Sequence, residues 1–324
     1  MNLIPEKPTI PKQRLEEYNI LLFSEPGMGK TTLGNQFENS IMMLFESGTS
    51  GILSYDINLV EKSKETGKPV WELFKEAKHQ LLNDEHDFDT VVIDTATKAY
   101  DYALDYWRDY KLGGTHPSQT ENMIGYSQLN SELKTQFNDL LNSKLGTLII
   151  CHAEYKAIKQ LDGLKRDKLV PDTGGSFGNW LMGESDIIIF YDKDTEGNRI
   201  LRVEGSKDFD AKQRIPLSKN IPAGESPQEA YQNFKEEFNQ AIKQVNKEMG
   251  VTEEMIEAHY QEQKAKEERA EILNKIKDIA TSKGLSKEEN RNLLQDRYAV
   301  QSIADLDNNQ AKEYLQFLEE DYLV

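Results

Sequence analysis

The first two-thirds of the chain alternate between short apolar runs and longer amphipathic stretches. The apolar runs have the length and composition of buried strands and lie at residues 20–23, 41–45, 90–93, 146–151, 186–191 and 200–203. The intervening stretches are helical in pattern at residues 30–39, 69–83, 97–110 and 122–142. This alternation predicts an α/β fold with a mainly parallel sheet flanked by helices. The last two runs, joined by a short turn, are expected to form a hairpin.

The pattern changes near residue 225. Prolines and a glycine within residues 216–227 mark a linker, and the chain after it is rich in helix formers. We therefore expect a core over residues 1–224 and an acidic all-α extension over residues 225–324. Helices are expected at 227–249 and 252–282, with a small helical module near 270–324.

A local motif follows the first apolar run. Residues 19–32 read NILLFSEPGMGKTT, in which a strand leads through a glycine-rich turn into the start of a helix. This is the layout of a P-loop, which binds a nucleoside triphosphate. The expected nucleotide-binding residues are Ser24, Glu25, Pro26, Gly27, Met28, Gly29, Lys30, Thr31 and Thr32.

Phosphate binding needs these residue types. Gly27 and Gly29 let successive backbone N–H groups turn inwards and cradle phosphate oxygens. Lys30 would reach the β- and γ-phosphates of ATP, and the Thr31 hydroxyl would coordinate Mg²⁺. Ser24 departs from the pattern, because it stands where a P-loop has its first glycine. The alternative interpretation is a glycine turn that precedes a helix by chance.

Polar residues follow three other predicted strands. Asp94 ends the run 90–93, where a P-loop enzyme needs an acidic group for the water shell of Mg²⁺. The alternative is that Asp94 caps the next helix, since Asp94, Thr95 and Thr97 could all act as caps. Glu46 and His152 follow two further runs. Because ligands bind outside the carboxyl ends of parallel strands, we expect these three residues to converge with Lys30 on one edge of the sheet.

The most basic stretch of the chain is residues 156–175. It contains four lysines, one arginine and three glycines. One interpretation is a mobile loop that contacts the phosphate backbone of single-stranded DNA. The other is a solvated β-hairpin or loop without such a role.

Composition limits the class of protein. The 324 residues carry a net charge of −17, which argues against a protein that coats nucleic acid with a uniformly basic face. The single cysteine, Cys151, excludes an internal disulfide bond and fits a reducing cytoplasm. No signal sequence opens the chain, and no run approaches the roughly 18 apolar residues of a transmembrane helix. We therefore expect a cytoplasmic protein that makes no membrane contact.

Five motifs together resemble the short RecA-like or AAA-type phage ATPases. They are SEPGMGKTT at 24–32, FESG at 45–48, VVIDT at 91–95, IICHAE at 149–154 and AKQR at 211–214. The resemblance covers roughly residues 15–220. It implies a RecA-like P-loop NTPase core that binds ATP and Mg²⁺, hydrolyses ATP and acts on DNA in phage recombination or replication, in some members during single-strand annealing. It would place the protein in the cytoplasm of a bacterial host.

The resemblance also implies roles for single residues. Glu46 would polarise the attacking water and His152 would sense the γ-phosphate. Lys212 and Arg214 match a K-x-R motif that reaches the γ-phosphate of a neighbouring subunit, which implies a homo-oligomer with ATP at its subunit interfaces. The alternatives are a surface glutamate, a satisfied core histidine and an ordinary basic strand end.

Two other functions remain open at this stage. The protein could be a nucleotide-gated adaptor whose helical tail recruits a replication or recombination partner with little hydrolysis. A P-loop kinase of small molecules is less favoured, because such kinases need a lid with several arginines and the arginines here do not cluster in that way.

Overall fold

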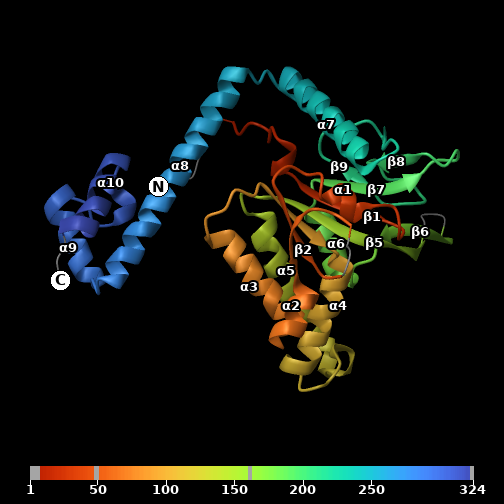
Figure 1. Cartoon of the computed structure of the whole chain (residues 1–324), viewed down its shortest axis with the longest axis horizontal. Coiled ribbons are helices and arrows are strands. Elements are labelled where there is room, and N and C mark those ends of the chain that lie inside the picture. The colour runs from red at the N-terminus through yellow and green to blue at the C-terminus, as the bar shows by residue number, and fades with distance from the viewer. Residues whose placement is uncertain (1–7, 47–50, 160–162, 322–324) are drawn as a thin grey trace. The chain divides into compact units, whose positions relative to one another are not determined.

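The computed structural model describes residues 8–46, 51–159 and 163–321. They form two compact units. One unit spans Pro11–Met249, and the other consists of the described residues 8–10 and 250–321. The first unit holds the sheet and its helices, whereas the C-terminal part of the chain is helical (Figure 1).

The sheet has ten strands. They are β1 (Asn19–Ser24), β2 (Ser40–Leu44), β3 (Tyr55–Asn58), β4 (Thr90–Asp94), β5 (Gly146–Lys159), β6 (Lys165–Pro171), β7 (Ile187–Lys193), β8 (Arg199–Arg202), β9 (Lys212–Gln213) and β10 (Asn220–Pro222). Their order is β10-β8-β7-β1-β5-β4-β2-β3, with β6 paired to β5 and β9 to β7.

The centre of the sheet is parallel. The pairs β3–β2, β2–β4, β4–β5, β5–β1 and β1–β7 are parallel, and the pairs made by β6, β8, β9 and β10 are antiparallel. The expected α/β fold with a mainly parallel sheet is confirmed. The expected hairpin is also present, as β7 and β8.

Helices cover both faces of the sheet. Alternate residues of each buried strand point to opposite sides, and the apolar side chains on both sides are packed against helices. Leu21 and Phe23 of β1 join a core with α3 (Val70–Asn83), α4 (Ala96–Tyr106), α5 (Ile124–Leu141) and α6 (Gly175–Glu184). Ile20 and Leu22 join a second core with α1 (Lys30–Gly34) and α7 (Pro227–Met249). Figure 1 shows α3, α4 and α5 together on one side of the sheet and α7 on the other.

Two regions differ from the sequence-based expectation. Between the apolar run 41–45 and the helical stretch 69–83, where the sequence analysis expects neither a strand nor a helix, lie the edge strand β3 and then α2 (Leu59–Thr66). Ser47 to Ser50, part of the FESG motif and its continuation, lie outside the described residues. The strand expected to end at Cys151 continues to Lys159 and pairs with β6. The basic stretch is therefore largely a β-hairpin, which is the second of the two interpretations of its structure.

The boundary of the first unit also differs from the expected position at residue 224, because α7 packs on the sheet. Phe238 stacks edge-to-face on Tyr18 with ring centroids 5.0 Å apart, and Tyr231 lies 5.2 Å from Phe37. Phe234, which lies between these two residues in the sequence of α7, is also buried. An amphipathic helix that buries aromatic residues in this way belongs to the unit that it covers, so the compact unit ends at Met249.

Phe234→Ala should therefore destabilise the α/β unit by about 3–5 kcal/mol, the usual cost of removing a buried phenylalanine. All three tryptophans, Trp71, Trp107 and Trp180, lie in this unit, so denaturant unfolding followed by tryptophan fluorescence reports on it alone. Met255→Ala, on the C-terminal side of the boundary, is the control and should leave the transition unchanged. If Phe234→Ala left the unfolding transition unchanged, α7 would not belong to the α/β unit and the boundary would lie at residue 224 as expected.

The C-terminal unit is built from α8 (Glu253–Ser282), α9 (Lys287–Tyr298) and α10 (Asn308–Gln316). Ile276, Leu294 and Tyr314 are buried together in its core. Ser286 and Glu289 form a capping box at the start of α9, as their spacing predicts. Short 3₁₀ or π segments lie at Leu15–Glu17, Trp107–Lys111, Pro117–Gln119, Glu121–Met123, Ile303–Asp305 and Phe317–Asp321. Among the described helices, none combines the length and apolar character needed to cross a membrane.

Candidate active site

The P-loop connects β1 to α1. Gly27 has φ of 81° and Gly29 has φ of 93°, values that are strained for residues with a Cβ atom. No atom would crowd a Cβ at Gly27, so the backbone angle rather than lack of space requires glycine there. The turn is therefore a local property of these residues, as expected for a loop that points its N–H groups at a ligand.

Lys30 is buried beneath this loop. Its Nζ donates to the Ser24 carbonyl and the Ser24 Oγ, both at 3.0 Å, and to the Glu25 carbonyl at 3.2 Å. Burial lowers the pKa of Lys30, although the nearby charges of Asp94 and Glu46 oppose the shift. Ser24 therefore does more than fill the glycine position, because its hydroxyl helps to hold the lysine ammonium in place.

Thr31, in α1, and Asp94, at the end of β4, lie together although β1, which leads into α1, is not adjacent to β4. Strand β5 separates β1 from β4, so the two strands are not direct neighbours, yet the Thr31 Oγ1 donates to the Asp94 Oδ2 at 2.7 Å. Thr95, not Asp94, caps α4, since its side chain accepts a hydrogen bond from the Lys98 N–H. This leaves the Asp94 carboxylate facing the P-loop. A hydroxyl and a carboxylate are oxygen ligands of the kind Mg²⁺ prefers, so the pair fits this ion.

Burial raises the pKa of Asp94, against the opposing hydrogen bond from Thr31. The folded protein therefore binds the Asp94 proton more tightly than the unfolded chain does, so ionising Asp94 lowers the free energy of unfolding as pH rises. Asp94→Asn should stabilise the metal-free protein at pH 7 by about 0.5–2 kcal/mol and weaken Mg²⁺-dependent nucleotide binding.

The gain in stability should largely disappear near pH 3, where an unfolded aspartate is itself mostly protonated. Urea unfolding at the two pH values measures it, with the exposed Asp87→Asn as the control. Destabilisation by Asp94→Asn in metal-free buffer would instead mean that Asp94 chiefly holds the Thr31 hydroxyl.

Glu46 and His152 form a second pair at the same edge of the sheet. The His152 Nε2 lies 3.3 Å from the Glu46 Oε1. The hydrogen bond from His152 is the main cause of a lowered Glu46 pKa, with burial opposing it. Both side chains are about one-third exposed, at 28% for His152 and 33% for Glu46. Glu46 is therefore held as a carboxylate that solvent can reach.

The first turn of α4 completes the site with residues to which the sequence analysis gave no catalytic or binding role. The Thr97 Oγ1 accepts from the His152 N–H at 3.1 Å and donates to the Asp172 carbonyl at 2.6 Å. The Thr95 hydroxyl is hydrogen-bonded to Glu46, and the charge of Lys98 also lowers the Glu46 pKa. The signal that could have found them is the polar sequence DTATK, directly after an apolar strand.

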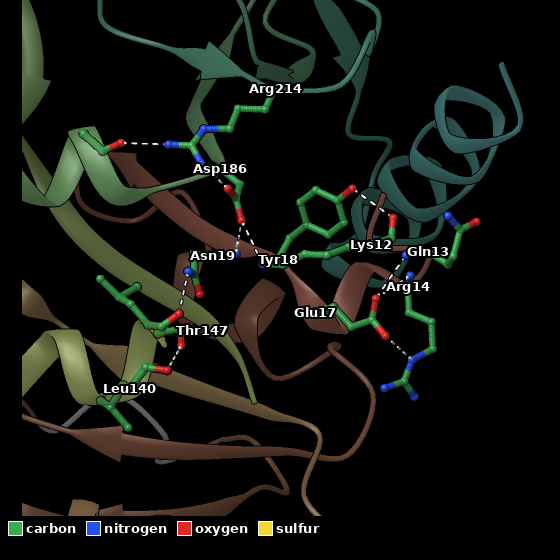
Figure 2. Close-up of polar contacts among 12 residues, drawn as sticks. Lys12, Gln13, Arg14, Glu17, Tyr18, Asn19, Leu140, Thr147, Asp186 and Arg214 are labelled. Atoms are coloured by element: carbon green, nitrogen blue, oxygen red, sulfur yellow. Dashed lines mark hydrogen bonds and ion pairs between the residues drawn. The ribbon is translucent and has the colours of Figure 1, made fainter. Parts of the chain in front are cut away.

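Lys212 and Arg214 do not join this site in their own chain. The Arg214 guanidinium bonds the Asp186 Oδ1 at 2.8 Å and the Gly183 carbonyl at 3.1 Å. Figure 2 shows Asp186 between Arg214 and the backbone of Asn19, at the amino end of β1. The P-loop follows the other end of this six-residue strand, roughly 17 Å away. Lys212 likewise donates to the Gly183 carbonyl, at 2.7 Å.

A cavity of about 620 Å³ opens beside the P-loop. Pro26 of the loop, Lys98 and Asp101 of α4, His152 of β5 and Asp172 contribute to its lining. The four residues expected to converge, together with Thr31, thus stand at the carboxyl edge of the sheet next to an open space. Such an arrangement can hold a phosphate chain, a metal ion and a water molecule between a lysine and a carboxylate.

Comparison with known families agrees with this geometry. A family model described as AAA domain matches residues 16–215, which is more than half of the chain. A search of the curated proteins found no match. The matched segment begins before β1 and ends after Arg214, so it includes the P-loop, Glu46, Asp94 and His152. The chain therefore belongs to the AAA domain family of P-loop ATPases.

Proposed function

We propose that the protein is a Mg²⁺-dependent ATPase of RecA type that acts on DNA during recombination or replication, as in phage. The observation that carries the ATPase part is the convergence of Lys30, Asp94 and Glu46 at one edge of the sheet beside the P-loop. These groups supply a phosphate-binding cation, a metal ligand and a general base within one chain.

The residues divide the work of hydrolysis. The P-loop N–H groups and Lys30 would bind the phosphates and balance their charge. Glu46, kept ionised by His152, would accept a proton from the attacking water and orient it towards the γ-phosphate. Thr31 and Asp94 would hold Mg²⁺, which neutralises charge on the β- and γ-phosphates when bound.

The proposed contact with single-stranded DNA lies on the β5–β6 hairpin. Lysines face each other across it in two register pairs, Lys156 with Lys168 and Lys159 with Lys165. Like charges directly opposite each other destabilise a hairpin. Lys168 is balanced by Asp210 at 2.6 Å, so the pair of Lys159 and Lys165 is the one to which a polyanionic ligand gives a role. Tyr155 is 67% exposed on the same hairpin and could stack on a base.

The hairpin is also continuous with the ATP site. Strand β5 carries His152, and the Asp172 N–H, just beyond β6, donates to the His152 carbonyl at 2.8 Å. A ligand that orders the hairpin would therefore act on the strand that positions Glu46. This continuity supports a DNA-dependent ATPase.

A homo-oligomer is part of the proposal. Because Arg214 lies at the opposite end of β1 from its own P-loop, it could contribute to hydrolysis only at the site of a neighbouring subunit. Its side chain is 53% exposed despite its ion pair, which leaves it accessible to a neighbour. Such a cation would stabilise charge on the transferring phosphoryl group.

Steady-state ATP hydrolysis with and without single-stranded DNA tests the proposal. We expect DNA to raise turnover of the wild type, and Lys159→Glu with Lys165→Glu to abolish the stimulation while basal turnover remains. Lys62→Glu with Lys64→Glu on α2 makes the same charge change and should leave the stimulation intact. Equal turnover with and without DNA would rule out the DNA-dependent function.

The C-terminal unit favours a second function, the nucleotide-gated adaptor. Residues 250–321 form a compact unit with their own apolar core, a suitable arrangement for binding a replication or recombination partner. The adaptor would bind ATP and hydrolyse it slowly whether or not DNA is present. Tight ATP binding with negligible turnover in both assays would favour it over the ATPase.

A further inference from the structure

We propose that Lys98 binds the γ-phosphate from within the same chain, and that Asp101 holds it aside until a nucleoside triphosphate arrives. The proposal rests on nucleotide binding at the P-loop and adds a second cation to that site. It makes Lys98 a residue that distinguishes ATP from ADP.

The first observation is the position of Lys98. It lies in the first turn of α4, and this turn follows Asp94 and Thr95 directly. The Lys98 N–H donates to the Thr95 Oγ1 at 3.2 Å. Its side chain lines the cavity that also exposes Pro26 of the P-loop and His152. Lys98 is thus anchored by its backbone at the catalytic edge of the sheet, while its flexible four-carbon stem reaches into the open space.

The second observation is the weak contact that holds Lys98. Its Nζ lies 3.0 Å from the Asp101 Oδ2, one turn further along α4. The two side chains are 43% and 53% exposed, and such a surface ion pair contributes little free energy. A phosphate oxygen carrying more charge could therefore draw the ammonium away from Asp101 at small cost.

The third observation is the electrostatic link to Glu46. Asp101 is the main cause of a raised Lys98 pKa, and the carboxylate of Glu46 raises it further. Conversely, the charge of Lys98 is among the causes of the lowered Glu46 pKa, after the hydrogen bond from His152. The Lys98 charge therefore already acts at the place where the attacking water would be oriented.

Other charged groups around the cavity do not fill this role. Lys156 lines the same cavity, and its charge lowers the pKa of Glu154. Glu154 and Asp172 are acidic and would repel phosphate. Lys212 and Arg214 are bound at the other edge of the sheet. Lys98 is therefore the described lysine outside the P-loop that is best placed to meet a γ-phosphate.

Nucleotide affinity tests the proposal without requiring turnover. Full-length Lys98→Ala should bind a non-hydrolysable ATP analogue with Mg²⁺ roughly 10- to 100-fold more weakly than wild type, the usual effect of losing a charge-assisted hydrogen bond. Its affinity for ADP should stay within about twofold, because ADP has no γ-phosphate. Lys98→Arg should restore most of the loss.

Asp101→Asn is expected to act in the opposite direction. It releases Lys98, so the ATP analogue should bind more tightly while ADP affinity is unchanged. Lys144→Ala removes the same charge from the exposed turn before β5, at the opposite edge of the sheet, and should match wild type. All measurements are repeated at two protein concentrations, because a residue acting within its own chain gives the same ratio at both.

Three outcomes would overturn the proposal. Equal loss of ATP and ADP affinity in Lys98→Ala would make the residue a general support of the P-loop. Unchanged affinity for both would make the pair with Asp101 an ordinary surface contact. A defect that depends on protein concentration would place Lys98 at the site of a neighbour. If the wild type binds neither nucleotide, the proposed ATPase function fails as well. In the three outcomes above the wild type still binds nucleotide, so the two kinds of failure can be told apart.

Discussion

Replacement of Lys30 by alanine is expected to abolish ATP hydrolysis, with a loss of at least about 10²–10³-fold, and to weaken ATP binding. Among the described residues, the buried Nζ bonds oxygens of Ser24 and Glu25. Phosphates that enter the P-loop would replace these neutral acceptors with charged ones and strengthen each bond. Isothermal titration with ATP and Mg²⁺, followed by a steady-state assay, measures both effects.

The loss in Lys30→Ala should not come from unfolding. Burial already disfavours the charged form of Lys30, so removing the ammonium also removes a desolvation cost. The thermal midpoint should therefore stay within a few degrees of wild type, and Lys144→Ala should keep full activity. ATP binding by Lys30→Ala with wild-type affinity would contradict the assignment of residues 24–32 as the nucleotide site.

Glu46→Gln is expected to retain ATP binding and lose about 10²–10⁴-fold in turnover, the usual contribution of a general base. Glutamine keeps the oxygen that faces the His152 Nε2, so the pair of side chains can persist without the negative charge. Single-turnover hydrolysis of bound ATP separates this chemical defect from a binding defect. Glu65→Gln, exposed on α2, is the matched control.

The pH dependence of turnover gives an independent check. Because the hydrogen bond from His152 lowers the Glu46 pKa, the carboxylate stays ionised to a lower pH than an ordinary glutamate. His152→Ala removes that bond, so the acid limb of the pH–rate profile should move to higher pH. Normal turnover by Glu46→Gln, or an acid limb that does not move, would identify Glu46 as a surface glutamate instead.

The sequence predicted the central strands because buried parallel strands are nearly continuous apolar runs. The runs at 20–23, 41–45 and 90–93 all became central strands, β1, β2 and β4. It missed β3, an edge strand with the pattern YDIN, and the helix α2 after it. An edge strand buries little, so its sequence carries no strong apolar signal.

The candidate site was only partly accessible from the sequence. Asp94, Glu46 and His152 each follow a predicted strand directly, and Lys30 follows another strand through the P-loop. The carboxyl ends of parallel strands share one edge. Thr97 and Lys98 lie in a helix, where nothing in the sequence tells which way a side chain points. Their hydrogen bonds to His152 and Asp101 were needed to bring them into the site.

The sequence by itself determined the P-loop and the α/β class of the first unit, because both depend on neighbours along the chain. A phosphate loop is made by consecutive backbone N–H groups, and a buried strand by consecutive apolar side chains. Only the tertiary structure decided that β5 separates β1 from β4, that α7 belongs to the first unit and that Arg214 lies far from its own P-loop. These three features depend on pairing and packing between residues distant in sequence, and an amphipathic pattern specifies that a face is buried without naming its partner.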